Sequence, residues 1–359
     1  RAIHFLIVEP AKGEYKLVFG NRENFTVYGI NYKITPLLRI NPFRFREGVH
    51  VLEHLDKLVS IFNVCWSMEA AMPAIMKQAL ERAYERAGWD LQLSENIYSS
   101  KLFPTFADVM EEVEEILNTS LYSEENKGNY IGALCTRLRE LTTGLNGMIF
   151  VANDLSDEEL FENNVIVDLS RIGSAETKSL IMGLLVIRLQ EYRQTTQRSI
   201  QTGLSHVTVL EEAHHLLRRT SEAVGSSNLA GKSVEMLTNA FAEMRSAGEG
   251  FIIVDQSPGL VDMAVIRNTN TKIVLRLPEI ADRTQVGKAM GLNDLQIAEL
   301  AKLPTGVGAV YQNDWLNSVL VKMPYYSANE TSYAYKPPSP EELLRSDENL
   351  LLDALMHKN

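Results

Sequence analysis

The fold is indicated first by the segment His206-Val207-Thr208-Val209-Leu210-Glu211-Glu212-Ala213-His214-His215. Its apolar run, Val207 to Leu210, ends in two adjacent carboxylates, Glu211 and Glu212, and then a small residue. A strand of a parallel sheet is continuously apolar because helices cover both of its faces, and ligands bind beyond its carboxyl end. The stretch therefore predicts a buried parallel strand with two carboxylates at a ligand-binding edge.

Two carboxylates in this position are typical of a Walker B motif. Glu211 would organise Mg²⁺ through water, and Glu212 would orient and deprotonate the water that attacks the γ-phosphate of ATP. The alternative is a solvated Glu-Glu pair at the start of a helix, where negative charge suits the helix dipole. The flanking residues favour the first interpretation.

Two further strands are predicted downstream. After a helical stretch from Lys232 to Ala247, the apolar run in Gly250-Phe251-Ile252-Ile253-Val254-Asp255-Gln256-Ser257-Pro258 ends in polar groups. Gln256 is expected to sense the γ-phosphate and position water, since a neutral amide both donates and accepts hydrogen bonds. The next strand, Thr271 to Leu277, carries Arg276, and a buried arginine needs an anionic partner.

The succession of segments resembles the HerA branch of the HerA–FtsK superfamily of hexameric, ATP-driven DNA translocases. The resemblance runs from about Phe5 to about Met323. It implies a RecA-like P-loop NTPase core with ATP and Mg²⁺ as cofactors, assembled as a homo-hexamer with double-stranded DNA as a partner. It is carried by FLIVEPAKGEY, INPFRF, VIVDLSRIGSAETK, LEEAHHLL, AEMRSAGEGFIIVDQSP, IRNTNTKIVLRLPEIADR and GLNDLQIAELAKLPTGVGAVYQ.

Three arginines are candidates for contacts with the nucleotide. Ring ATPases place the active site between subunits, where an arginine from the neighbour stabilises the charge that develops in phosphoryl transfer. By the family resemblance Arg245 is the catalytic finger acting in trans, Arg276 lies near the nucleotide, and Arg267 is a third candidate. The alternative for each is an ordinary ion pair with an acidic neighbour.

Other polar residues follow the predicted strands. Lys12, in a family-like segment, is a candidate for neutralising phosphate, with an exposed turn lysine as the alternative. Asp168 either joins the Mg²⁺ shell or caps the next helix, and capping is favoured. The resemblance implies that an imidazole of His214 or His215 touches the catalytic carboxylate.

No glycine-rich Walker A loop is found in the sequence. The resemblance places that loop just before Arg1, so we expect the chain to be part of a longer protein. Gly231-Lys232-Ser233 resembles the end of such a loop, but the pattern requires glycine where Ser226 stands, and no apolar strand precedes it. We expect a helix start there, with Ser233 near the first turn.

Composition agrees with a cytoplasmic α/β protein. The 359 residues, 45% of them hydrophobic, are enough to bury a sizeable core. Two cysteines are too few for a disulfide framework, which suits a reducing compartment. The sequence contains neither an apolar run of the ~20 residues needed to cross a bilayer nor a signal-peptide pattern, so we expect no membrane association.

The net charge of -11 argues against a broadly basic surface for coating DNA. It still permits a ring whose central channel carries a few basic residues. Arg188, Arg193 and Arg198 follow at five-residue intervals, which spreads charge around a helix and predicts a solvated helix end.

The chain divides into an interrupted α/β core and a helical insertion. Residues 1–41 and 163–324 are predicted to form a RecA-like ATPase core with a doubly wound, mainly parallel sheet. Residues 325–359 form a tail with a terminal helix from Glu341. Residues 42–162 form a helical insertion with apolar i, i+3, i+4 spacing over Val51–Val64, Met72–Ala87, Phe106–Leu117 and Tyr130–Thr143. Further core elements are expected at Phe5–Val8, Val165–Leu169, Glu176–Arg193 and, as a hairpin, Gly308–Tyr311 with Ser318–Val321.

The predicted function is an ATP-hydrolysing hexameric DNA translocase or helicase. The resemblance implies a nuclease or a NAD-degrading effector protein as its partner, in DNA end processing or in antiviral (anti-phage) defence. The alternative is a ring-shaped scaffold that multimerises and activates an effector with weak or no ATPase activity. A conjugation coupling ATPase of the same superfamily would predict a membrane segment, which the sequence does not contain.

Overall fold

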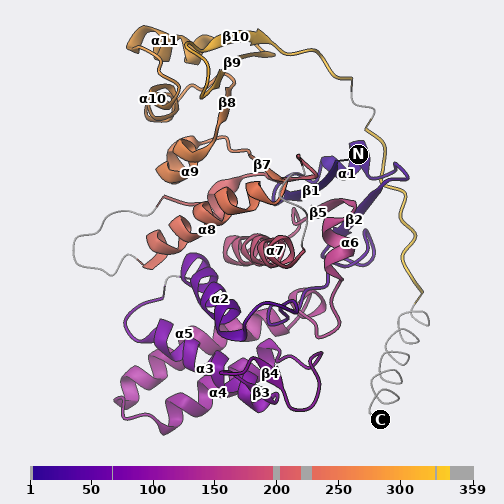
Figure 1. Ribbon diagram of the computed structural model, residues 1–359, viewed down its shortest axis with the longest axis vertical. Coiled ribbons are helices and arrows are strands. Elements are labelled where there is room, and N and C mark those ends of the chain that lie inside the picture. The colour runs from indigo at the N-terminus through magenta and orange to yellow at the C-terminus, as the bar shows by residue number, and fades with distance from the viewer. Residues whose placement is uncertain (1–2, 67, 197–202, 220–228, 328–329, 340–359) are drawn as a thin grey trace.

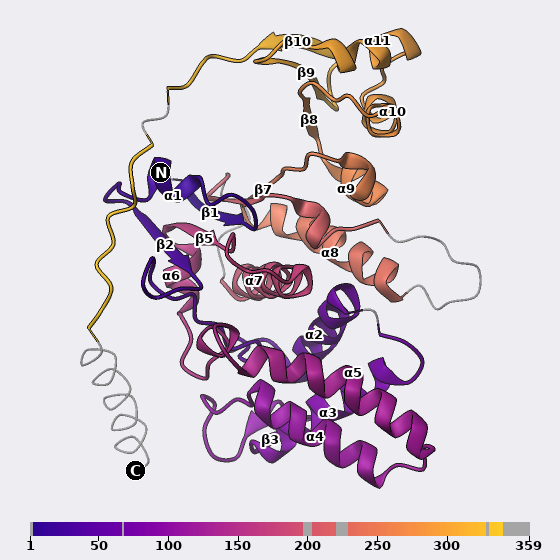
Figure 2. The same cartoon turned by 180° about the vertical axis from the view of Figure 1, so that it is seen from behind.

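The computed structural model describes residues 3–66, 68–196, 203–219, 229–327 and 330–339. Three layers follow one another along the longest axis of the molecule (Figure 1). A small antiparallel sheet with short helices lies at one end, a parallel sheet packed on long helices lies in the middle, and a group of helices lies at the other end. The view from behind shows the same order (Figure 2).

A five-stranded sheet forms the middle layer. Its strands are β1 (His4–Glu9), β2 (Phe25–Gly29), β5 (Asn164–Asp168), β6 (His206–Leu210) and β7 (Glu249–Ile253). Their order is β2-β5-β1-β6-β7, and every neighbouring pair is parallel. Every residue of β5 and β6 is buried, which accounts for their apolar sequences. The predicted α/β fold with a mainly parallel sheet is confirmed.

Within the central sheet, β2 is the strand that the sequence does not predict. It contributes a short run, Phe25 to Tyr28, that stops at Gly29, and polar residues precede it. Its partner is β5, with Phe25 opposite Asn164. Because that partner lies far along the chain, local periodicity carries no sign of the pairing.

Both faces of the sheet are covered. On one face, residues such as Leu6 and Val167 share a continuous core with the helix α7 (Ala175–Thr195). On the other face, Ile7 and Ile166 pack with the short helix α1 (Tyr15–Phe19) and with Tyr333 of the C-terminal segment. Almost every residue of α7 from Thr177 to Arg193 is buried, so this helix lacks the single apolar stripe of a surface helix.

Arg188 and Arg193 on α7 are buried, so the predicted solvated helix end is wrong for both; Arg198 lies outside the described residues. The reason is that α7 is enclosed on all sides, where arginine requires anionic partners. Arg188 Nε lies 2.6 Å from Asp157 Oδ1, and Arg193 Nε lies 3.0 Å from Glu249 Oε2. The second pair ties α7 to the amino end of β7.

The helices that periodicity predicts between residues 51 and 143 are present, and they pack below α7. α5 begins before the predicted start at Tyr130, because the Ser123 side chain accepts a hydrogen bond from the backbone of Asn126. The domain boundaries at residues 42 and 162 stay a prediction. The elements of this region are α2 (Val51–Cys65), α3 (Met72–Arg86), β3 (Trp89–Asp90), β4 (Glu95–Asn96), α4 (Phe106–Thr119), α5 (Glu124–Thr142) and α6 (Asp157–Phe161).

The strand predicted at Thr271 to Leu277 does not join the central sheet. A separate antiparallel sheet has the order β10-β9-β8. β8 ends before Arg276, whose side chain is exposed, so the expectation of a buried core arginine is wrong. Its segment lies at an edge open to solvent, where a guanidinium needs no ion pair. The elements here are α8 (Leu229–Ser246), which precedes β7, then α9 (Met263–Asn268), β8 (Thr271–Val274), α10 (Ile280–Ala289), α11 (Asp294–Glu299), β9 (Val307–Gln312) and β10 (Val319–Lys322).

The C-terminal segment returns to the central sheet. Asn21 Nδ2 donates to Thr331 Oγ1 and to the carbonyl of Ser332, both at 2.9 Å. The helix predicted from Glu341 lies outside the described residues. Within the described ranges, no helix combines the length and the apolar character needed to cross a membrane.

Replacing Arg193 with Met should lower the free energy of unfolding by about 3–5 kcal/mol, because Glu249 then stays buried without its guanidinium. Urea unfolding followed by circular dichroism measures the change. The matched control is Lys302→Met, which breaks an exposed ion pair with Glu299 and should change stability by less than about 0.5–1 kcal/mol. Equal effects of the two substitutions would contradict the structural role of Arg193.

Candidate active site

One edge of the central sheet gathers carboxylates from four strands. Because neighbouring strands are parallel, their carboxyl ends meet at the same edge, where ligands bind in α/β folds. Glu9 ends β1 and Asp168 ends β5, and both are buried. The carboxylates and amide found at this edge are Glu9, Asp168, Glu211, Glu212, Asp255 and Gln256.

Glu9 fixes the start of α1. Its carboxylate accepts hydrogen bonds from the backbone N–H groups of Glu14 at 2.7 Å and Tyr15 at 3.2 Å. Burial raises the pKa of Glu9, and the neighbouring charges of Asp168 and Glu211 act in the same direction. Negative charge is therefore concentrated at this edge, which favours a positively charged ligand.

Tyr15 and Lys16 of α1 reach back to the strand ends. The Tyr15 hydroxyl donates to Glu211, and the Lys16 ammonium pairs with Asp168. Burial and the hydrogen bond to Glu211 raise the pKa of Tyr15, so its hydroxyl stays a donor at neutral pH. The sequence does not single out Lys16 as a cation of this site. Its place in α1, shortly after the end of β1, could have suggested the role.

Asp168 does not cap α7, so that prediction is wrong. Its carboxylate accepts from the Ser170 backbone at 3.0 Å and from the Ser170 hydroxyl at 2.6 Å, which closes a turn directly after β5. The cap is Ser174, whose side chain accepts from the Thr177 N–H. Lys12, in contrast to Lys16, is exposed in its turn, and its ammonium lies 3.9 Å from Glu14.

Glu212 and Gln256 are brought together as the sequence predicts. Gln256 Nε2 donates to Glu212 Oε1 at 2.6 Å. The Glu212 backbone is left-handed, with φ of 46° and ψ of 51°, an uncommon conformation for a residue other than glycine. The Ala213 N–H donates to the carbonyl of Val254, which ties the turn after β6 to β7. The backbone thus turns Glu212 toward the neighbouring strand.

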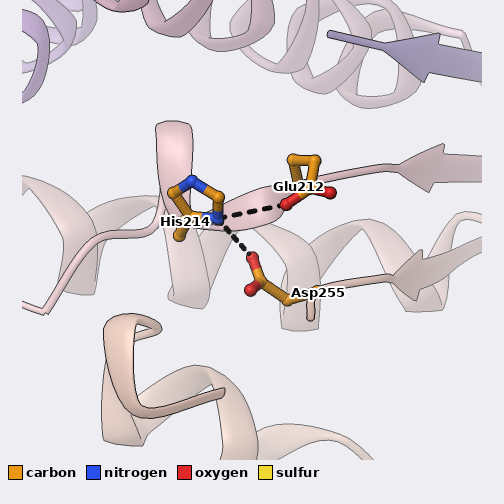
Figure 3. A group of neighbouring side chains, drawn as sticks. All are labelled: Glu212, His214 and Asp255. Atoms are coloured by element: carbon orange, nitrogen blue, oxygen red, sulfur yellow. Dashed lines mark hydrogen bonds and ion pairs between the residues drawn. The ribbon is translucent and has the colours of Figure 1, made fainter. Parts of the chain in front are cut away.

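His214 lies between two carboxylates (Figure 3). Its Nδ1 is 2.9 Å from Asp255 Oδ2 and 3.5 Å from Glu212 Oε2. Asp255 also accepts from the His214 backbone at 2.8 Å. The imidazole of His214 therefore approaches Glu212, the predicted catalytic carboxylate. Burial lowers the pKa of the adjacent His215. Asp255 precedes Gln256 in the sequence, but the sequence alone does not predict a role for it.

Within a single chain, the three candidate arginines lie on other elements than the strand-end carboxylates. Arg245 lies near the end of α8, before the amino end of β7, whereas Gln256 follows the carboxyl end of the same strand. Arg276 follows β8 of the separate sheet, and Arg267 lies in α9. All three side chains are exposed.

Gly231-Lys232-Ser233 lies within the first turns of α8 and does not form a loop after a strand. Ser233 is buried. The helix start expected from the sequence is present.

Comparisons with solved structures define the class of fold. The chain has a TM-score of 0.64 with VirB4 of Thermoanaerobacter pseudethanolicus, at 16% identity, covering 90% of this chain and 82% of that one. With the plasmid coupling protein TrwB in complex with ADP and Mg²⁺ the TM-score is 0.60 at 12% identity, covering 94% and 82%. The fold is that of the RecA-like P-loop ATPases.

The sequence comparison points to one branch. Over 177 residues the chain is 25% identical to the DNA double-strand break repair helicase HerA of Sulfurisphaera tokodaii. The match covers 49% of this chain and 33% of the relative, so it spans about a third of the length of that protein. The chain matches no protein-family model. The resemblance to HerA-like ATPases is confirmed by this relative.

Glu9→Gln tests the charge at the sheet edge. The pKa of Glu9 is raised above its usual value of 4.5 in the folded chain, so the unfolded chain releases this proton first as the pH rises. The wild-type protein should therefore lose stability relative to the variant as the pH rises through and above 4.5. Urea unfolding of both proteins at a series of pH values measures the difference, and a difference independent of pH would contradict this account.

Proposed function

We propose that this chain is the ATPase core of a ring-shaped, ATP-driven DNA translocase of the HerA type. The observation that carries the proposal is the pairing of Glu212 with Gln256 at the carboxyl ends of two neighbouring parallel strands. The similarity to the HerA helicase supports duplex DNA as the partner. We further propose that the protein assembles as a homo-hexamer, lies in the cytoplasm and works with a nuclease or a NAD-degrading effector as its partner.

In the proposed reaction Glu212 acts as the general base. A carboxylate in this position accepts a proton from the water that attacks the γ-phosphate, and Gln256 orients that water and senses the phosphate. The hydrogen bond between the two side chains holds the carboxylate toward the site. His214, at 3.5 Å from Glu212, is placed to influence the same carboxylate.

Glu211 is the proposed contact to Mg²⁺. Carboxylate oxygens are the donors that Mg²⁺ prefers, and this ion usually keeps several of its waters. The Tyr15 hydroxyl occupies one oxygen of Glu211 and leaves the other for a metal-bound water. The residues therefore fit the ion, which would supply neutralisation of phosphate charge when bound with ATP. Lys12 and Arg276 stay candidates for nucleotide contacts.

The phosphate loop is proposed to come from outside these 359 residues. Among the described residues β7 has a neighbour on one side, β6, and Ile252 of β7 is 50% exposed. An apolar edge strand presents unpaired N–H and C=O groups to a further strand. A parallel strand added to β7 would bring a phosphate-binding loop beside Gln256.

The role of Glu212 is tested by Glu212→Gln in the full-length protein. ATP binding and assembly should be retained, while hydrolysis falls by about 10²- to 10⁴-fold, because the amide does not accept the proton from water. Steady-state phosphate release measures hydrolysis, and binding of a fluorescent ATP analogue measures affinity. Unchanged hydrolysis would sink the assignment.

The role of Arg245 is tested by mixing two inactive variants. In a symmetric ring, Arg245→Ala subunits supply Glu212 and Glu212→Gln subunits supply Arg245, so about a quarter of the interfaces in a random mixture are complete. ATP hydrolysis should exceed the sum of the two separate variants only if Arg245 acts in trans. Arg139→Ala, which removes an exposed arginine of α5, is the matched control and should retain turnover.

The second candidate function is a scaffold that multimerises an effector. The net charge of -11 favours it. DNA-stimulated ATP hydrolysis by the full-length protein, with its mass measured by light scattering, distinguishes the two. Stimulated turnover by a hexamer supports the motor, and an inert hexamer supports the scaffold. The likeness to VirB4 and TrwB shows the fold and does not bear on this choice.

A further inference from the structure

In the group formed by Glu212, His214 and Asp255, an imidazole stands between two carboxylates (Figure 3). We propose that these three residues bind a transition-metal ion of the Zn²⁺ type, separate from the Mg²⁺ expected at Glu211. One atom of each side chain, His214 Nδ1, Glu212 Oε2 and Asp255 Oδ2, would be a ligand. The bound ion would hold the carboxylate of Glu212 and so inhibit hydrolysis.

The spacing of the three ligand atoms fits tetrahedral coordination. Metal–ligand bonds of about 2.0–2.1 Å place neighbouring ligands of a tetrahedron about 3.3 Å apart. His214 Nδ1 lies 2.9 Å from Asp255 Oδ2 and 3.5 Å from Glu212 Oε2. One ligand atom from each of the three residues lies within 4.8 Å of the other two. Small rotations of the side chains would place an ion at bonding distance from all three.

Each carboxylate is oriented by a donor outside this group. Gln256 Nε2 donates to Glu212 Oε1 at 2.6 Å, and the Ser257 N–H donates to Asp255 Oδ1 at 2.8 Å. These bonds engage Glu212 Oε1 and Asp255 Oδ1. Glu212 Oε2 and Asp255 Oδ2 face the His214 ring, and Asp255 Oδ2 also accepts from the His214 backbone N–H at 2.8 Å. Donors that orient ligands in this way are typical of metal sites in proteins.

The site is open enough for an ion to enter and sheltered enough to hold it. The side chains of His214 and Glu212 are 25% and 16% exposed, and that of Asp255 is 6% exposed. Two carboxylates and a neutral imidazole carry a formal charge that balances a divalent cation. A fourth position is left for water on the solvent side.

The ligand set selects the class of metal. Imidazole suits Zn²⁺, Co²⁺ and similar ions, whereas Mg²⁺ prefers oxygen ligands and retains its water. Glu211 is engaged by Tyr15 and is not part of this group. The two adjacent glutamates would therefore serve different ions, and the inhibitory consequence rests on the proposed function of Glu212.

Binding is tested with ZnCl₂ by calorimetry, and with CoCl₂ by visible absorption, using the full-length protein without nucleotide. His214→Gln should weaken Zn²⁺ binding by more than about 100-fold, and Gln256→Ala by about 10- to 100-fold through loss of orientation. His215→Gln is the matched control, since its ring lies beside that of His214, with 4.6 Å between the centroids, yet is no ligand in this proposal. It should bind Zn²⁺ like the wild type.

Measurements of Zn²⁺ binding and of ATP hydrolysis test the metal site and the proposed function independently. Equal Zn²⁺ affinity in the wild type and His214→Gln, with unchanged thermal unfolding, would overturn the site. If His214→Gln unfolds, Asp255→Asn provides the second test, with the same loss of Zn²⁺ binding expected. Zn²⁺ should also inhibit ATP hydrolysis in excess Mg²⁺. Zn²⁺ binding that depends on His214, in a protein that hydrolyses no ATP, would support the site and contradict the proposed function.

Discussion

The parallel register of β6 with β1 and β7 is the constraint on which the site depends. Val8 stands opposite Leu210, and Leu210 opposite Ile253, so the residues that follow these strands emerge at the same level. Covering helices then exclude water from both faces of the sheet and leave its carboxyl edge as the place for polar chemistry. A shift of one residue in β6 would exchange the faces of its side chains and separate Glu212 from Gln256.

Buried charge is balanced differently at the two edges of the sheet. At the amino edge Glu249 is buried, but Arg193, His206 and Thr208 all bond to its carboxylate, so its charge is matched within the fold. At the carboxyl edge, carboxylates from four strands meet Lys16 and His214. Burial raises the pKa of Glu9 there, and the charges of Asp168 and Glu211 add a smaller effect in the same direction. An acidic edge suits cations such as the two metal ions proposed for it.

Glu212 connects the two proposals. Its left-handed backbone turns the side chain toward β7, where Gln256 and His214 approach different oxygens of one carboxylate. The same carboxylate that would accept a proton from water is therefore placed to accept a metal ion. A group that performs both functions would couple ATP hydrolysis to the availability of a transition metal, without any movement of a domain.

The sequence predicts the parallel sheet and the nearness of Glu212 to Gln256, because apolar runs and the polar residues that end them are local patterns. It did not determine that Arg188 and Arg193 are buried, since periodicity describes one helix and not what encloses it. Likewise β8 has the composition of a core strand, yet it pairs in a separate sheet. The meetings of His214 with Asp255 and of Lys16 with Asp168 depend on the tertiary structure, because strand order and the path of α1 bring these side chains together across long stretches of chain.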